Sequence, residues 1–119
     1  MKTAVITGAG SGVGQAVAVK FSNEGWNVAL IGRRADALQD TFTQCGGDAQ
    51  RVLLCPGDVG VLAEVQRIAQ AVLAKFPTVD CLVNSAGTNI PKRKLEVLSA
   101  EDYHRVIDAN LHGSFYTVQ

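Results

Sequence analysis

The feature that most constrains the fold of this chain is a glycine-rich stretch near its beginning, residues 7–14, which read TGAGSGVG. It directly follows the short apolar run of residues 4–6 and opens a segment with helical spacing. Glycines at the end of a strand let the backbone approach an anion, and the N–H groups and positive end of the next helix can then hold it. The sequence therefore predicts a nucleotide-binding strand–turn–helix unit. A glycine-rich turn without a ligand is the alternative.

The positions of these glycines narrow the kind of nucleotide site. The dinucleotide pattern G-x-G-x-x-G fails in every frame, because a valine or a glutamine stands where the third glycine is needed. A P-loop is excluded because no Gly-Lys-Ser/Thr follows. The pattern that fits is T-G-x-x-x-G-x-G, formed by Thr7, Gly8, Gly12 and Gly14.

Length, composition and charge limit the class of protein. The 119 residues are 47% hydrophobic, enough for the core of one small domain. Eleven basic and eleven acidic residues cancel, so we expect neither a nucleic-acid nor a membrane surface. The apolar run at the start is too short for a signal peptide, and no later run approaches the length of a membrane span.

The cysteines indicate a reducing compartment. Cys45, Cys55 and Cys81 are an odd number without a C-x-x-C pair, which argues against a disulfide framework and against a zinc site. We expect each to be a small core residue, no metal to be bound, and the protein to be cytoplasmic.

Short apolar runs and longer segments with helical spacing alternate along the chain. Such alternation is typical of a parallel sheet, and right-handed crossovers would give the strand order 3-2-1-4. We expect an α/β fold, a doubly wound parallel sheet truncated after the fourth strand and its following helix. The expected strands are residues 4–6, 28–31, 52–55 and 81–83, and the expected helices follow Gly12, span 35–44 and 62–76, and start again at Ser99.

One side of the first expected helix is apolar. Val13, Val17 and Phe21, with Ala16, recur on that side, and Gly25 ends the segment. An apolar stripe on one face of a segment is typical of an amphipathic helix.

Polar and glycine residues follow each expected strand. In an open α/β sheet, ligands bind over the carboxyl ends of the strands, where the strand order reverses. All four loops at that edge carry ligand-like residues, which supports the nucleotide site more strongly than one motif does. They are residues 8–14, 33–34, 58–59 and 84–87.

These motifs together resemble those of the short-chain dehydrogenase/reductase family. They occur in the family's order over residues 4–113: the T-G-x-x-x-G-x-G turn, an acidic residue after the third strand, N-S-A-G in place of N-N-A-G, and N-x-x-G. The resemblance implies a Rossmann-like NAD(P)-binding domain that transfers hydride between a nicotinamide and a small carbonyl or alcohol substrate. The cofactor-binding residues it implies are Gly8, Ser11, Gly12, Val13, Gly14, Arg33, Arg34, Asp58, Val59, Asn84, Ala86 and Gly87.

The residues after the second expected strand bear on the choice of cofactor. An NAD-binding fold usually has a carboxylate there for the ribose, whereas this chain has Arg33 and Arg34. A guanidinium can pair with a 2′-phosphate, which favours NADP, with NAD possible. Alternatively, the arginines only solvate the start of the next helix. Ser11 also argues against NADP, because the family's phosphate-selective members often have a base there.

The residues after the third and fourth strands have more specific implied roles. By resemblance, Asp58 accepts a hydrogen bond from the adenine amino group; capping the next helix is its alternative role. The small Ala86 and Gly87 permit close approach of the ribose and nicotinamide, while Asn84 can tie neighbouring strands together. Ser85 replaces an asparagine of the family motif, which puts local bracing of the sheet in doubt.

Asn110 is the one catalytic residue that the resemblance implies in this chain. Its backbone carbonyl would hold a water of a proton relay; alternatively, its side chain bonds only within its own helix.

The family's catalytic Tyr-x-x-x-Lys is not found in the sequence, because Tyr103 is followed four residues later by Ile107 and Tyr116 lies too close to the end. We therefore expect residues 1–119 to be the N-terminal part of a single NAD(P)-binding domain, an incomplete and inactive fragment of an oxidoreductase that forms homo-oligomers. The alternative is a non-catalytic nucleotide-binding or redox-sensing module.

Overall fold

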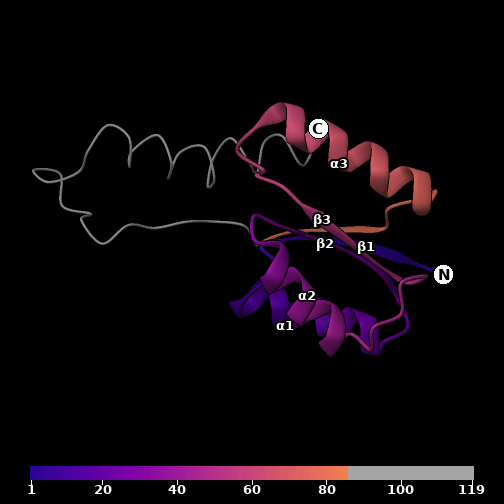
Figure 1. The fold of residues 1–119 in the computed structure, drawn as a ribbon. Helices are drawn as coiled ribbons and strands as arrows, with labels where there is room; N and C mark the ends of the chain where they lie inside the picture. The colour runs from indigo at the N-terminus through magenta and orange to yellow at the C-terminus, as the bar shows by residue number, and fades with distance from the viewer. Residues whose placement is uncertain (86–119) are drawn as a thin grey trace, which may run out of the picture.

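A parallel sheet with helices on both faces forms the described part of the protein, residues 1–85 of the computed structural model. Helices α1 and α2 cover one face and α3 covers the other, which gives three layers (Figure 1). The elements are β1 (Thr3–Thr7), α1 (Gly12–Asn23), β2 (Asn27–Gly32), α2 (Ala35–Gln44), β3 (Val52–Pro56), α3 (Leu62–Lys75) and β4 (Cys81–Asn84). This confirms the predicted alternation within residues 1–85, with element ends that lie within one or two residues of the predicted ones.

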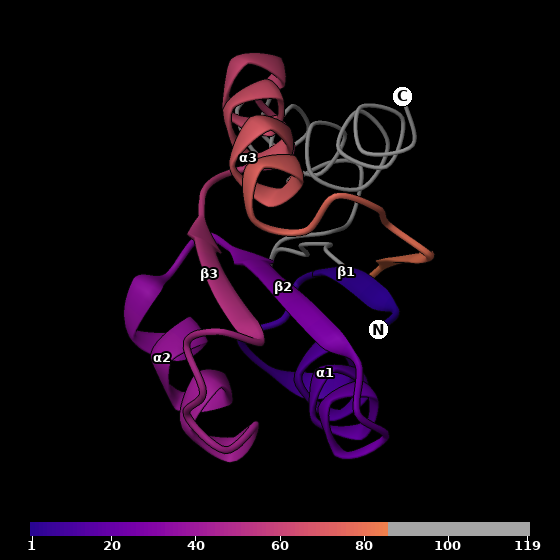
Figure 2. The same ribbon diagram turned by 90° about the vertical axis from the view of Figure 1, so that its right-hand side faces the viewer.

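The strand order is β3-β2-β1-β4, and all neighbouring strands are parallel, as predicted. In the register, Thr7 at the end of β1 pairs with Ile31 of β2 and with Asn84 of β4. Figure 2 shows β3, β2 and β1 next to one another in this order. Because the order reverses at β1, the carboxyl ends of the strands meet where the glycine turn leaves the sheet.

The core consists of one apolar layer on each face of the sheet. Side chains alternate along β1: Ala4 and Ile6 pack toward α1 and α2, whereas Val5 packs toward α3. On the second face, Ile68 and Val72 of α3 are buried against the strands, as their spacing predicts. Both faces of these strands are therefore covered, which accounts for their nearly continuous apolar sequences.

The most deeply buried side of α1 is not the apolar side that the sequence pattern picks out. The residues of α1 that are buried are Gly14, Ala18 and Ser22, whereas Val13 is 72% exposed. Small residues at four-residue steps let the helix axis lie close to the sheet, and the larger Val17 and Phe21 pack at its flank. The pattern favoured the larger apolar residues, although close packing here requires small ones.

Several sequence-based predictions concern residues that the structure does not describe. Ala86, Gly87, Asn110 and the helix expected from Ser99 lie outside residues 1–85.

Candidate functional site

The glycine turn ends at the N-terminus of α1, where no side chain of the described residues caps the helix. Ser11 occupies the cap position in extended conformation, but its hydroxyl makes no capping hydrogen bond, and the first turn contains no acidic residue. The backbone then enters the helix at Gly12 with φ of +57°, a conformation that side chains disfavour. The positive end of α1 therefore remains available for an anion.

Gly14 is required by the close approach of α1 to the preceding turn. A Cβ atom at this position would fall on the carbonyl oxygen of Gly8. Any larger residue would push the helix away from the turn, so Gly14 holds the helix end and the turn together.

A pocket of about 600 Å³ opens beside this turn, at the carboxyl ends of β1, β2 and β3. It brings together six of the predicted residues from three loops: Gly8, Ser11, Arg33, Arg34, Asp58 and Val59. The other described members of the predicted set, Gly12, Val13, Gly14 and Asn84, do not line it. Val13 instead lines an apolar groove with Phe21 and Trp26 on the flank of α1.

The pocket also contains residues that the sequence reasoning did not single out. Gly10, Gly32 and Gly57 leave room at the ends of the strands, and Ala37 and Asp40 face the pocket from α2. Ala37 and Asp40 are three residues apart on the helix that follows the two arginines, so they lie on the same face of that helix. This spacing was the sequence signal that both residues could line the pocket.

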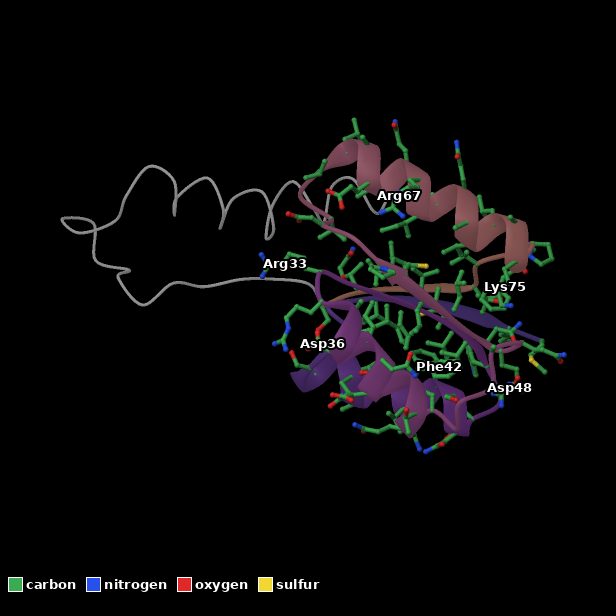
Figure 3. The ribbon with its side chains drawn as sticks, in the orientation of Figure 1. Arg33, Asp36, Phe42, Asp48, Arg67 and Lys75 are labelled. Atoms are coloured by element: carbon green, nitrogen blue, oxygen red, sulfur yellow. The ribbon has the colours of Figure 1, made fainter. Side chains whose placement is uncertain are left out.

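The two arginines have different surroundings. Arg34 forms a 2.9 Å ion pair with Asp36 at the surface, and this hydrogen bond raises the pKa of Arg34 and lowers that of Asp36. Among residues 1–85, Arg33 makes no hydrogen bond or ion pair. Figure 3 shows Arg33 and Asp36 at one end of the described part of the protein, opposite Lys75 and Asp48. Of the two arginines that line the pocket, Arg33 is thus the one without an ion-pair partner within residues 1–85.

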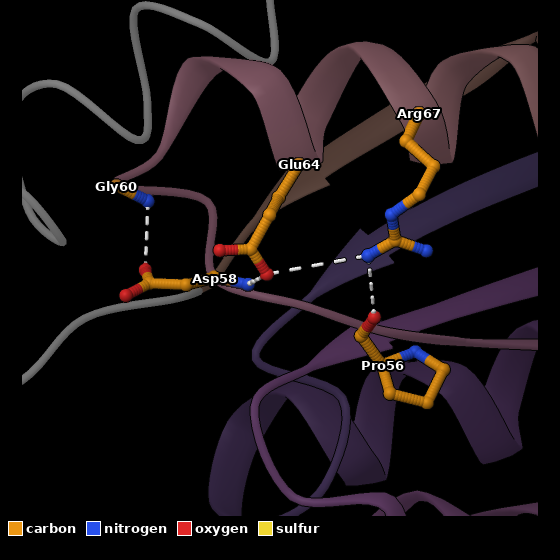
Figure 4. Close-up of polar contacts among 5 residues, drawn as sticks. All are labelled: Pro56, Asp58, Gly60, Glu64 and Arg67. Atoms are coloured by element: carbon orange, nitrogen blue, oxygen red, sulfur yellow. Dashed lines mark hydrogen bonds and ion pairs between the residues drawn. The ribbon is translucent and has the colours of Figure 1, made fainter.

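The loop that carries Asp58 is held by α3 (Figure 4). The backbone N–H of Asp58 donates to Oε1 of Glu64 at 3.0 Å, and Arg67 donates to the carbonyl of Pro56 at 3.1 Å. The Asp58 carboxylate accepts from the N–H of Gly60 at 2.8 Å. Since the cap residue of α3 is Val61, Asp58 stabilises the turn before the helix and does not cap the helix itself.

The segment after β4 is braced through the backbone. The N–H of Ser85 donates to the buried hydroxyl of Thr7 at 3.0 Å. This bond does not use the Ser85 side chain, so this contact is retained although serine replaces the asparagine of the family motif.

The structure also bears on the expectations about cysteines, metals and membranes. Cys45 and Cys55 are buried and Cys81 is half-buried, and all three are free thiols. Within residues 1–85, no cluster of His, Cys, Asp or Glu could hold a metal ion. No helix in this part of the chain has both the length and the apolar character needed to cross a membrane.

A parallel sheet in this order, with a glycine turn and a pocket at the carboxyl ends of its strands, defines a Rossmann-like α/β protein. The sequence model of the family described as short chain dehydrogenase matches residues 2–119. The chain therefore belongs to the short-chain dehydrogenase family. An uncharacterized oxidoreductase of Staphylococcus aureus strain N315 is 36% identical over 118 residues, and one of Staphylococcus epidermidis is 34% identical. Each match covers 99% of this chain and 50% of the relative, so the chain spans about half the length of these relatives.

Solved structures show the same fold. A 3-ketoacyl-(acyl-carrier-protein) reductase of Brucella melitensis, complexed with NADH, superposes with a TM-score of 0.90 at 31% identity, over 98% of this chain and 47% of that protein. An alcohol dehydrogenase of the archaeon Thermococcus sibiricus, complexed with 5-hydroxy-NADP, has a TM-score of 0.90 at 34% identity, over 99% and 50%. The two relatives thus carry different nicotinamide cofactors.

Proposed function

We propose that the protein to which this chain belongs is an NADP(H)-dependent oxidoreductase that transfers hydride between the nicotinamide and a small carbonyl or alcohol substrate. Family membership supports the reaction class, and the pocket supports the cofactor. The turn of residues 8–14 and the N-terminus of α1 would hold the pyrophosphate. Bound nicotinamide would supply the hydride chemistry.

The observation that carries the cofactor proposal is the position of Arg33. Its guanidinium lies at the pocket without a partner among residues 1–85, on the loop where NAD-binding folds usually have a carboxylate. A 2′-phosphate can pair with such a guanidinium through charge-assisted hydrogen bonds. Arg34, already paired with Asp36, would contribute less. The presence of Asp40 and Asp58 in the same pocket limits the attraction for phosphate to the side near the arginines.

The other predicted residues receive roles consistent with this binding mode. Asp58 accepts from the adenine amino group with the part of its carboxylate that does not bond Gly60. Asn84, Ala86 and Gly87 would lie toward the ribose and nicotinamide, and Asn110 would hold the water of the proton relay.

The proposal is tested with the Arg33→Ala variant. Loss of a charge-assisted contact worth about 1.5–3 kcal/mol should weaken NADPH binding roughly 10- to 100-fold, with NADH affinity nearly unchanged. Arg34→Ala is the matched control and should have the smaller effect. Equal losses for both cofactors would contradict the role of Arg33.

Turnover separates the enzyme from a non-catalytic module. The whole protein to which this chain belongs should consume NADPH in the presence of a panel of carbonyl compounds. Tight binding of NADPH with no turnover on any alcohol or carbonyl would instead favour the nucleotide-binding or redox-sensing alternative.

We also propose a cytoplasmic location and a homo-oligomeric state for the whole protein. Three free thiols, two of them buried, support a reducing compartment. Sedimentation of the purified protein would test the oligomeric state.

A further inference from the structure

The hydroxyl of Thr41 lies at the junction of three segments: the glycine turn, α1 and α2. Thr41 belongs to α2, and its side chain is completely buried. Its Oγ1 donates to the carbonyl of Ala9 at 2.7 Å and accepts from Nε2 of Gln15 at 3.0 Å. A single buried hydroxyl therefore connects the turn to both neighbouring helices.

The hydrogen-bonding capacity of this hydroxyl favours the bond to the turn. A threonine hydroxyl has one proton to donate. The competing acceptor within α2, the carbonyl of Ala37, is at 3.3 Å, clearly longer than the 2.7 Å bond to Ala9. Gln15 donates to a lone pair of the same oxygen, and the shorter distance to Ala9 directs the proton of Thr41 toward the turn.

Ala9 is consequently fixed on both sides of its backbone. Its N–H donates to the carbonyl of Ile31 in β2 at 3.1 Å, and its carbonyl accepts from Thr41. Ala9 itself is buried, whereas its neighbours Gly8 and Gly10 line the pocket. The contact of Gly10 with α2 is also close, since a Cβ on Gly10 would lie 2.9 Å from that of Ala37.

We propose that Thr41 and Gln15 are positioning residues that set the conformation of the turn for the phosphates of the cofactor. Neither residue lines the pocket, so each acts through Ala9 or through the other. Glycines give this turn many accessible conformations, and the buried hydroxyl selects one of them. This inference rests on the proposed binding of the pyrophosphate at the turn.

The test compares two ligands on the Thr41→Val variant, which keeps the shape of the side chain and removes the hydroxyl. NADPH carries the pyrophosphate that the turn would hold, whereas adenosine 2′-monophosphate reaches only the adenine and 2′-phosphate part of the pocket. If the glycine turn of this variant adopts the conformation that binds the pyrophosphate in about one tenth of the molecules, the Kd for NADPH rises about tenfold. The Kd for adenosine 2′-monophosphate should stay unchanged, and Thr41→Ser, which restores the hydroxyl, should restore NADPH binding.

The matched control is Thr43→Val. Thr43 lies on the same helix and donates to the carbonyl of Gln39 at 3.1 Å, but it is exposed and forms no hydrogen bond with the glycine turn. This variant should bind both ligands like the wild type. Should Thr41→Val fail to fold, as judged by circular dichroism, the half-buried Gln15→Met decides instead, with an expected rise of about threefold in the Kd for NADPH alone.

Distinct results overturn the inference and the proposed function. Wild-type affinity for NADPH in folded Thr41→Val, or in Gln15→Met when it is the deciding variant, overturns the inference. An equal loss of affinity for NADPH and for adenosine 2′-monophosphate also overturns it, because a merely structural role of the residue would weaken the binding of both ligands alike. Failure of the wild-type protein to bind NADPH at all would instead remove the proposed function on which the inference depends.

Discussion

Glu64 accepts a hydrogen bond from the backbone N–H of Asp58 at 3.0 Å, so helix α3 fixes the loop at the end of β3 (Figure 4). The carboxylate of Asp58 is oriented by a separate hydrogen bond, which it accepts from the N–H of Gly60 at 2.8 Å. Within residues 1–85, Glu64 and Thr41 thus both hold loops of the pocket without lining it: Glu64 bonds the Asp58 loop, and Thr41 bonds the glycine turn.

The role of the Glu64 carboxylate in holding the Asp58 loop can be tested by substitution of Glu64. Glu64→Ala leaves the N–H of Asp58 without its acceptor and should weaken NADPH binding roughly 3- to 10-fold. Glu64→Gln keeps an oxygen acceptor and should remain close to wild type. The measurement is a calorimetric titration of each variant.

The analogue with hypoxanthine in place of adenine is the control for this prediction. It lacks the amino group that Asp58 would accept from, so its affinity should change less than that of NADPH in Glu64→Ala. Equal losses for the two cofactors, or no loss, would contradict the role of the Asp58 loop.

Two glycines of the turn should differ in their sensitivity to alanine. Gly14→Ala places a Cβ on the carbonyl oxygen of Gly8 and should lower the free energy of unfolding by about 3 kcal/mol or more. Gly12→Ala meets no atom within 4 Å and has only its φ of +57° to accommodate, so about 1–2 kcal/mol is expected. Urea denaturation of both variants gives the comparison. A reversed order would mean that α1 does not approach the turn as closely as described.

The three thiols should react at different rates. Burial raises the pKa of the Cys55 thiol to about 11, and it also raises the pKa of the Cys45 thiol. Since the thiolate is the reactive form, iodoacetamide near pH 8 should modify half-buried Cys81 at least about tenfold faster than Cys55. Mass spectrometry of peptides measures the rates, and in urea all three should become similar. Fastest labelling at Cys55 in the folded protein would contradict its burial.

The same shift implies a pH dependence of stability. The pKa of Cys55 is higher in the folded than in the unfolded protein, so the folded state disfavours the thiolate. The contribution of the protonated Cys55 thiol to the free energy of unfolding is present below the pKa of about 8.5 expected in the unfolded chain. It is lost as the pH rises toward about 11, the pKa in the folded protein. Cys55→Ala should therefore show a smaller loss of stability over this range than the wild type.

The sequence predicted the fold well because each strand is a short apolar run with a clear boundary. Residues 35–44 were predicted as a helix with the same bounds as α2, and the strand order followed from right-handed crossovers. The buried face of α1 was not predicted, because Gly14, Ala18 and Ser22 contribute through their small size and not through hydrophobicity.

The site was predictable only where a residue leaves the end of a strand. Six predicted residues line the pocket because topology alone brings those ends together. Thr41 and Glu64 support the site through helix packing, and Thr41 contacts a residue 32 positions away. Thr41 stands three residues after Leu38 and four before Cys45, on the buried face of α2. A polar residue at this spacing was the sequence signal of a buried, hydrogen-bonded hydroxyl.

We propose that the pocket beside the glycine turn binds NADP(H) in preference to NAD(H). The most direct test is calorimetric titration of the protein with NADPH and with NADH under the same buffer and salt. We predict a Kd at least about tenfold lower for NADPH, as expected from one added charge-assisted contact. Equal affinities would contradict the assignment of the arginine-bearing loop to the 2′-phosphate, and absence of binding by either cofactor would contradict the account of the site itself.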